Sequence, residues 1–357
     1  MANIFDYLND VAYDSFYDLP VNELDVLALT ELTYLAFDGV VTQEPQRLIE
    51  LAPQIPRDTT MLTSKNRLQL LDQLAQHKRF KNCKLSDFIN DIDPELQKQF
   101  AAMTYRISLD TYLLVFRGTD DSIIGWKEDF HMTYMKEIPA QKHALQYLQD
   151  FFDQHPNQKV ILAGHSKGGN LAVYAASQLD PLLQKNIVAV YTFDAPGLHK
   201  ELTETPDYQN MMERTKVFIP QGSIIGMMLE IPDKKIVVRS TALGGLAQHD
   251  TFSWQVEDKH FVQLDETNSD SQQVDTTFKE WVETVPDEEL QLYFDLFFGI
   301  ILDAGISSIN DLSSFKVIEH IHQLFVQAQS LTPEERETMG RLTQLLIDTR
   351  YQAWKNR

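Results

Sequence analysis

The pentapeptide Gly164-His165-Ser166-Lys167-Gly168 places a serine between two glycines at a spacing that suits nucleophilic chemistry. A serine hydroxyl can attack a carbonyl group when it protrudes from a tight turn between a strand and a helix, and such a turn strains the serine backbone. The neighbouring chain crowds the turn, so the positions two before and two after must be nearly free of side chain. We therefore predict Ser166 as a nucleophile, with Gly164 and Gly168 forming its elbow.

A nucleophilic serine needs a base, and the pKa of histidine suits proton transfer near neutral pH. His199, His249 and His260 are the histidines that follow the serine closely enough in the chain. His249 lies in a glycine-containing loop, LGGLAQHDTFSW, just past an apolar strand pattern, so the loop could bring it over the serine. The other two have polar surroundings that are typical of solvated side chains. We predict His249 as the base.

A carboxylate that orients the imidazole is expected after a strand that follows the nucleophile. The segment YTFDAPG places Asp194 at the end of the next strand pattern. The strand after that one ends in KVFIPQGSIIG, which offers Gly222 and Ser223 but no carboxylate, whereas Glu230 and Asp233 come later. We predict Asp194 as the acid, with Asp233 as the alternative.

Two backbone N–H groups are expected to stabilise the oxyanion that forms when the serine attacks. The helix pattern that opens after Ser166 leaves its first N–H groups without partners, so the N–H of Lys167 would be one donor. The strand and turn of VFRGTDDSIIGW would supply the second donor, the N–H of Thr119. The alternative is that Gly118-Thr119 forms an ordinary glycine turn.

Strand and helix patterns alternate around these residues. Short apolar runs rich in β-branched residues occur in KVILAG, NIVAVYTF, TKVFIP and KIVVRST, and helical spacing separates several of them. This alternation favours an α/β fold with a mostly parallel sheet and helices on both faces. Before these runs, AAMTYRISLDTYLLVFRGT predicts a β-hairpin, and residues 43–95 are expected to be helical.

The two ends of the chain have helical patterns. NELDVLALTELTYLAFDG predicts an amphipathic helix that Asn22 caps and Gly39 ends. Beyond Trp254 the chain is first polar and then helical. We therefore expect an N-terminal helical segment at 1–95 packed on the core, an α/β core at 96–265, and an α-helical C-terminal extension at 266–357.

Composition argues against several classes of function. The chain has 52 acidic and 31 basic residues, a formal net charge of −21, which disfavours nucleic acid as a partner. Its one cysteine, Cys83, permits no intrachain disulfide and no cysteine-rich zinc site. The acidic start predicts no secretory signal, and the most apolar stretch, LQLYFDLFFGIILDAGI, is interrupted by Asp295 and Gly299. We expect a cytoplasmic protein with no transmembrane segment, no metal and no cofactor, and leave its oligomeric state open.

The motifs FRGT, GHSKGG and YTFDAPG succeed one another as in the class 3 lipases, and the chain resembles that family over roughly residues 20 to 260. The helix pattern NELDVLALTELTYLAFDG and the segment QHDTFSW resemble a bacterial lipase-like branch usually described as a domain of unknown function. The resemblance implies an α/β-hydrolase fold, with Ser166 as nucleophile and His249 as base. It also implies Thr119 and Lys167 as oxyanion donors.

The chain departs from class 3 lipases at two positions. Those enzymes take their acid from the strand end that here reads QGSIIG, so either the acid has moved to Asp194 or the triad is incomplete. They usually carry an apolar residue at the position of Lys167, but only the backbone of that residue is needed for the chemistry.

These observations predict a serine hydrolase that cleaves a carboxylic ester through a Ser-His-Asp triad. The expected partner is a small acyl-ester or lipid-like substrate, and SIIGWKEDFHM lies where the lid of such an enzyme commonly sits. A thioesterase or peptidase would share the triad. The other interpretation is a non-catalytic hydrolase-like module that binds a protein partner through its helical extension, since the usual acid is missing.

Overall fold

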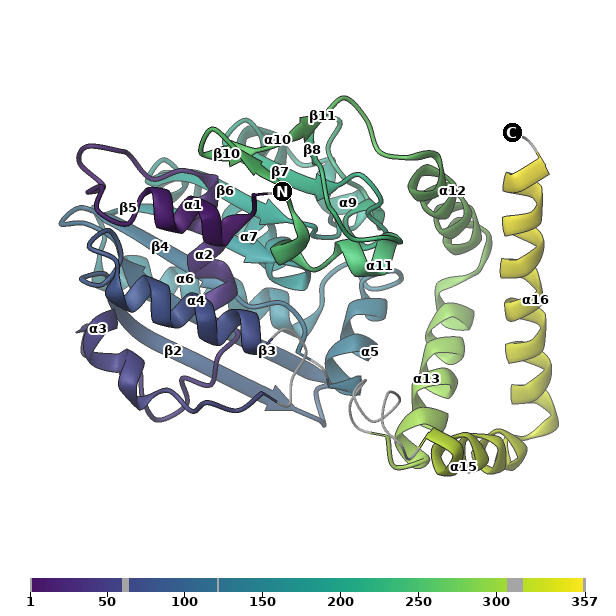
Figure 1. Cartoon of the computed structure of the whole chain (residues 1–357). Helices are drawn as coiled ribbons and strands as arrows, with labels where there is room; N and C mark the ends of the chain where they lie inside the picture. Colours follow the sequence, from purple (N-terminus) through teal and green to yellow (C-terminus); the bar gives the residue numbers. More distant parts are fainter. Residues whose placement is uncertain (1, 60–63, 121, 307–316, 356–357) are drawn as a thin grey trace.

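The computed structural model describes residues 2–59, 64–120, 122–306 and 317–355. Within these residues a nine-stranded sheet forms the centre of the fold, in the order β1-β2-β3-β4-β5-β6-β7-β8-β11 (Figure 1). Strands β4 to β8 are parallel to one another, and the pairs toward both edges are antiparallel. The strands are β1 Gln46–Arg47, β2 Lys84–Asp93, β3 Lys98–Arg106, β4 Thr111–Phe116, β5 Lys159–His165, β6 Ile187–Phe193, β7 Thr215–Pro220, β8 Lys235–Val238 and β11 Gln263–Leu264.

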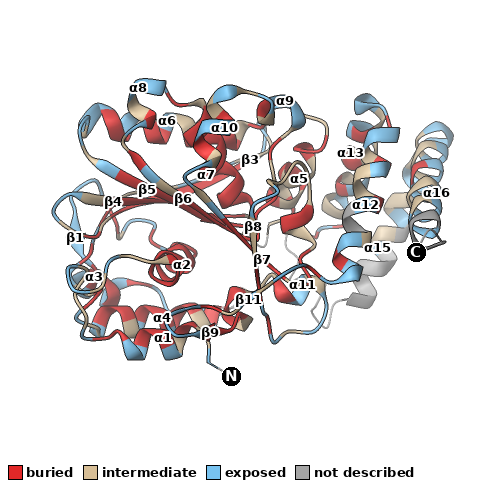
Figure 2. Cartoon of the chain, turned by 90° about the horizontal axis from the view of Figure 1, so that it is seen from above, coloured by how far each residue is buried: buried red, intermediate tan, exposed pale blue. Residues whose placement is uncertain are grey.

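Helices cover both faces of this sheet, as Figure 2 shows. One face carries α6 (Pro139–Gln154), α7 (Lys167–Gln178) and α10 (Pro206–Met212), and the other carries α1 (Ile4–Asp10), α2 (Glu23–Leu32) and α4 (Ser64–Gln76). Successive residues of a strand point to opposite faces, so in β4 Leu113 packs toward α2 while Leu114 packs toward α6 and α7. Both are fully buried, as expected for a strand covered on both sides. The predicted α/β architecture with a mostly parallel sheet is confirmed.

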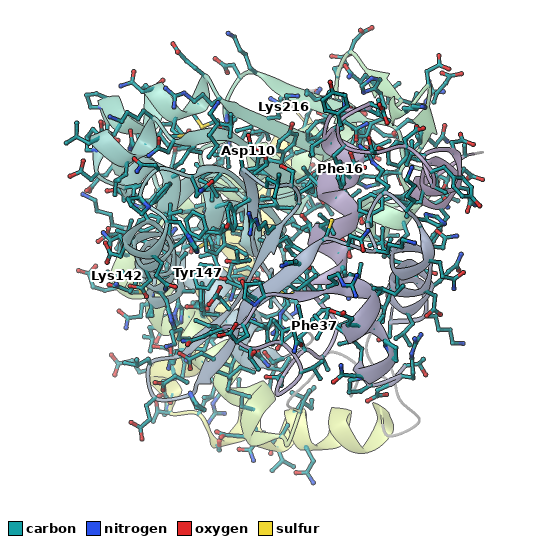
Figure 3. The ribbon with its side chains drawn as sticks, turned by 90° about the vertical axis from the view of Figure 1, so that its left-hand side faces the viewer. Phe16, Phe37, Asp110, Lys142, Tyr147 and Lys216 are labelled. Atoms are coloured by element: carbon teal, nitrogen blue, oxygen red, sulfur yellow. The ribbon has the colours of Figure 1, made fainter. Side chains whose placement is uncertain are left out.

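Shorter elements complete the core. A second, two-stranded sheet pairs β9 (Val256–Glu257) with β10 (His260–Phe261). The remaining short helices of the core are α3 Leu48–Leu51, α8 Pro181–Gln184, α9 Lys200–Thr203 and α11 Gly245–Gln248, with single 3₁₀ turns at Ala52–Gln54, Ile225–Met227 and Thr251–Ser253. Tyr147 of α6, labelled in Figure 3, reaches across to the sheet and lies 2.8 Å from the Thr104 hydroxyl of β3.

The expectation that residues 43–95 are helical is wrong for its last part. Residues Lys84–Asp93 form β2, which pairs antiparallel with β3 and is interrupted by a shift in register after Ser86. The segment KLSDFINDID has several acidic residues and few β-branched ones, so the strand conformation comes from pairing with β3 and not from local propensity. The sheet therefore begins before residue 96, and a boundary at 95 separates two paired strands.

Helix α2 starts where the sequence predicts, but its surroundings differ from the expectation. The Asn22 side chain accepts hydrogen bonds from the N–H groups of Leu24 and Asp25, and the Asp25 carboxylate accepts one from the N–H of Asn22. The helix is not amphipathic, because it lies between the sheet and the layer of α1 and α4 and all of its residues are buried (Figure 2). It ends at Leu32, and Gly39, with φ of +70°, lies in a later turn.

Buried arginines neutralise the acidic residues of α2. Arg79 lies 2.5 Å from Asp25, measured from Nη2 to Oδ2, and Arg67 lies 3.0 Å from Glu31, measured from Nη2 to Oε2. A buried carboxylate is costly unless it is paired and hydrogen-bonded, so these pairs make the burial of α2 possible.

The C-terminal helices stand beside the core in Figure 1: α12 (Ser269–Thr284), α13 (Asp287–Asp303), α15 (Val317–Ser330) and α16 (Pro333–Lys355). They contact the core mainly through α5 (Ile123–His131), where Phe130 packs against Phe294 and Phe298 with ring centroids 4.8 and 5.6 Å apart. Lys127 of α5 also pairs with Asp295 of α13 at 2.7 Å. Among the described helices, none has both the length and the apolar character needed to cross a bilayer.

Candidate active site

Ser166 occupies a strained turn between β5 and α7. Its φ of 57° and ψ of −137° fall in a region that side-chain-bearing residues rarely adopt. A Cβ atom on Gly164 would lie 2.0 Å from the carbonyl carbon of Gly168, and one on Gly168 would lie 2.0 Å from the carbonyl oxygen of Phe116. The chain therefore passes itself so closely here that both positions require glycine.

His249 and Asp194 form a direct hydrogen bond. His249 follows α11, and its Nδ1 lies 2.6 Å from Oδ2 of Asp194. Asp194 comes directly after β6, has a positive φ of 44° and is fully buried. Since Ser166 directly follows β5, the neighbouring parallel strand, the two residues lie at the same edge of the sheet.

Two further donors hold the Asp194 carboxylate. The hydroxyl of Ser223 donates to Oδ1 at 2.5 Å, and the N–H of Gly226 donates to the same oxygen at 3.1 Å. Ser223 lies just after β7, in the segment that lacks a carboxylate in the sequence. Its role as a partner of Asp194 was missed by sequence reasoning, because only the fold brings the ends of β6 and β7 together.

His249 also lies against the elbow. The rings of His249 and His165 have centroids 4.4 Å apart, and Nε2 of His165 lies 3.0 Å from the carbonyl oxygen of His249. Ser166 is 8% exposed, and within the described residues its hydroxyl forms no hydrogen bond. The structure thus places the His249 ring against the residue that precedes Ser166, and no hydrogen bond joins the imidazole to the Ser166 hydroxyl.

The other candidates from the sequence lie in different surroundings. His199 caps α9. His260 belongs to β10, has a 61% exposed side chain and pairs with Glu23 at 2.6 Å. Asp233 is exposed, in the loop between β7 and β8.

A buried hydrogen-bond network links Tyr34, which follows α2, to Gly118 and to His165 of the elbow. The hydroxyl of Tyr34 accepts a hydrogen bond from the N–H of Gly118 at 3.1 Å and lies 3.2 Å from Nδ1 of His165. Burial, reinforced by the neighbouring His249, lowers the pKa of His165 to about 4. The imidazole of His165 is therefore neutral near pH 7. Its Nδ1 can accept a hydrogen bond from the Tyr34 hydroxyl, while its Nε2–H donates one to the His249 carbonyl. Tyr34 lies within the motif NELDVLALTELTYLAFDG, but the sequence analysis assigns it no role.

The Gly118-Thr119 loop approaches Ser166 closely. A Cβ atom on Gly118 would lie 3.0 Å from Cβ of Ser166 and 2.4 Å from the carbonyl oxygen of His165. Within the described residues, the backbone N–H groups of Thr119 and Lys167 donate no hydrogen bond.

Thr119 is fixed by a carboxylate from α5. Its hydroxyl donates to Oδ2 of Asp129 at 2.6 Å. Burial raises the pKa of Asp129 to about 6, although the nearby Lys167 ammonium and the Thr119 hydrogen bond act in the opposite direction. The loop next to Ser166 is thus tied to the segment where the sequence predicts a lid.

Lys167 has a role for its side chain that the sequence analysis does not assign. Its ammonium group is fully buried and lies 2.8 Å from Oε2 of Glu128 and 2.9 Å from the carbonyl oxygen of Gln99. No group of three or more histidine, cysteine, aspartate or glutamate side chains that could hold a metal occurs in the part of the chain that the structure describes.

Comparison with known proteins places these motifs in a family. The model of the family described as Mbeg1-like matches residues 74–299. A comparison with curated protein sequences finds no match.

Solved structures of fungal lipases are also similar to this chain. The mono- and diacylglycerol lipase from Aspergillus oryzae is 16% identical, with a TM-score of 0.43 over 69% of this chain and 87% of that one. The lipase from Rhizopus microsporus var. chinensis is 16% identical, with a TM-score of 0.36 over 71% of this chain and 84% of that one. For the Rhizomucor miehei lipase propeptide complex the identity is 15% and the TM-score 0.37, over 64% and 75% of the two chains. The chain belongs to the Mbeg1-like family, whose model covers more than half of it.

Proposed function

We propose that this protein is a serine hydrolase that cleaves carboxylic esters through Ser166, His249 and Asp194. The observation that carries the proposal is the 2.6 Å hydrogen bond between His249 Nδ1 and Asp194 Oδ2, at the same sheet edge as the strained Ser166. A buried carboxylate that holds an imidazole beside an elbow serine is the arrangement that activates a hydroxyl for acyl transfer.

In the first half of the proposed reaction, Ser166 Oγ attacks the ester carbonyl carbon and its proton passes to Nε2 of His249. Asp194 holds Nδ1–H and stabilises the imidazolium. The carbonyl oxygen becomes an oxyanion, which accepts hydrogen bonds from the N–H groups of Thr119 and Lys167. His249 then gives its proton to the alcohol oxygen, the C–O bond breaks, and an acyl group remains on Ser166.

In the second half, a water molecule gives a proton to His249 and attacks the acyl carbon. The tetrahedral intermediate collapses, the carboxylic acid leaves, and His249 returns the proton to Ser166. The hydroxyl of Ser166 is not hydrogen-bonded to His249 in this structure. Catalytic hydrogen bonds of this kind often tighten only when substrate is bound, so the arrangement is compatible with the scheme.

The proposed substrate is a small acyl ester or a lipid-like ester in the cytoplasm. Helix α5 follows the Thr119 loop, and its apolar side chains Ile123 and Phe130 pack with the C-terminal helices. We further propose that residues 266–357 act as a helical extension that covers α5.

A fluorophosphonate probe tests the proposal, because it labels only serines that are activated for nucleophilic attack. We expect labelling of the wild-type protein and hydrolysis of p-nitrophenyl acyl esters, and expect Ser166→Ala to lose both. Ser177→Ala is the matched control, since Ser177 is a buried serine of α7, the helix that follows Ser166, and its hydroxyl donates to the carbonyl of Tyr174. A folded wild-type protein that is not labelled would instead favour the non-catalytic binding module.

A further inference from the structure

The side chain of Lys167 lies in a fully buried ion pair directly behind the elbow. Its exposed fraction is 0%, as is that of its partner Glu128. The ammonium donates to Glu128 Oε2 at 2.8 Å and to the carbonyl oxygen of Gln99, at the start of β3, at 2.9 Å. Burial of an ammonium is unfavourable unless such partners surround it, so this contact fixes the elbow, β3 and α5 relative to one another.

Glu128 is itself held from three directions. Besides Lys167, it accepts a hydrogen bond from the N–H of Gln99 at 2.9 Å and one from the N–H of Ala140, in the first turn of α6, at 3.1 Å. A carboxylate with this many donors has little freedom to move, and negative charge is favoured at a helix N-terminus. Glu128 therefore fixes the position of α5 relative to β3 and to the start of α6.

Asp129, the next residue of α5, connects the Lys167–Glu128 ion pair to the Gly118-Thr119 loop. Asp129 accepts the hydroxyl hydrogen bond of Thr119, and its Oδ1 lies 3.8 Å from the Lys167 ammonium. That oxygen is buried and has no hydrogen-bond partner within the described residues. Lys167 is thus the cation that faces both carboxylates, Glu128 and Asp129.

We propose that the Lys167 side chain is a positioning residue that sets the distance between the two oxyanion donors. The N–H of Lys167 is one donor of the proposed reaction, and its ammonium holds the helix whose Asp129 orients Thr119, the other donor. This inference rests on the proposed function. An oxyanion is stabilised only when both donors point at the place where its charge develops, so a small shift of α5 lowers the rate of the chemical step.

The test is Lys167→Met, which keeps the length of the side chain and the backbone N–H but removes the charge. We expect kcat for a p-nitrophenyl ester to fall by about tenfold or more while KM stays within about twofold, because the loss falls on the transition state. Lys98→Met is the matched control, since Lys98, the first residue of β3, likewise pairs with a carboxylate, Asp91, at 2.6 Å. We expect its kcat to stay within about twofold of the wild-type value.

Glu128→Gln is the second variant, in case Lys167→Met does not fold. It keeps the shape of the side chain and is expected to lower kcat in the same direction. Melting temperatures of all variants separate stability from rate. A folded Lys167→Met or Glu128→Gln protein that is destabilised but keeps the wild-type kcat would overturn the positioning role and leave the proposed function intact. A folded wild-type protein without esterase activity would overturn both.

Discussion

The hydroxyl of Ser223, just after β7, donates a hydrogen bond of 2.5 Å to the carboxylate of Asp194, just after β6. In class 3 lipases, which this chain resembles, the acid itself comes from the strand end where Ser223 stands. Here a serine at that place supports a carboxylate on the neighbouring strand. The acid that we propose, Asp194, therefore follows the strand before the one that supplies the acid in class 3 lipases.

Asp194→Asn is expected to lower kcat by about 10⁴-fold with little change in structure, because the amide cannot hold His249 in the required tautomer. Asp233→Asn, at the exposed alternative position, should keep the wild-type kcat. Ester hydrolysis by the two variants measures the difference. Equal activities would remove Asp194 from the proposed mechanism.

Ser223→Ala removes one of three donors to the Asp194 carboxylate. A hydrogen bond to a charged group contributes about 1.5–3 kcal/mol, and the two remaining donors compensate in part. We expect kcat to fall by about tenfold, which corresponds to about 1.4 kcal/mol. Steady-state kinetics beside Ser177→Ala gives the comparison, and an unchanged kcat would mean that Ser223 does not support the acid.

Gly168→Ala is expected to prevent folding of the elbow, because the new Cβ would lie 2.0 Å from the carbonyl oxygen of Phe116. Gly340→Ala, by contrast, is expected to stabilise the protein. Gly340 lies within helix α16 with nothing within 4 Å of a Cβ, so alanine should raise the free energy of unfolding by about 0.5–1 kcal/mol. Chemical denaturation of both variants tests the pair, and a soluble, fully active Gly168→Ala protein would contradict the crowding argument.

Asp129→Asn should change the pH dependence of stability. Burial raises the pKa of Asp129 from its ordinary 3.8 to about 6 in the folded protein, so the native state binds this proton more tightly than the unfolded state. The contribution of Asp129 to stability is therefore largest below pH 3.8 and is lost as the pH rises through about 6. We expect Asp129→Asn to gain stability relative to wild type over this interval, as measured by denaturation at pH 4, 5, 6 and 7. A difference that does not depend on pH would contradict the pKa shift.

The central strands of the fold could be predicted from the sequence because their signal is local. In β5 and β6, short β-branched runs are followed by turns and helical spacing, and the structure has these strands where the patterns place them. Helix α2 shows the limit of this reasoning. Asp25 and Glu31 indicate a solvated face, but their partners Arg79 and Arg67 are distant in the sequence, so the burial of α2 could not be inferred.

The same distinction applies to the candidate site. Ser166 and Asp194 could be selected because each ends a strand in a short motif. The contacts of Tyr34, Ser223 and the Lys167 ammonium depend on elements that only tertiary structure brings together, and no spacing in the sequence encodes them.

The buried position of α2 has a practical consequence for any shortened version of this protein. The family match begins at residue 74, whereas α2 and Tyr34 precede it. A fragment limited to the matched region would leave the apolar face of β4 and β5 open to water and the N–H of Gly118 without its acceptor. Such a fragment would expose the apolar side chains of the sheet that α2 covers and would aggregate, so α2 belongs to the same folding unit as the sheet.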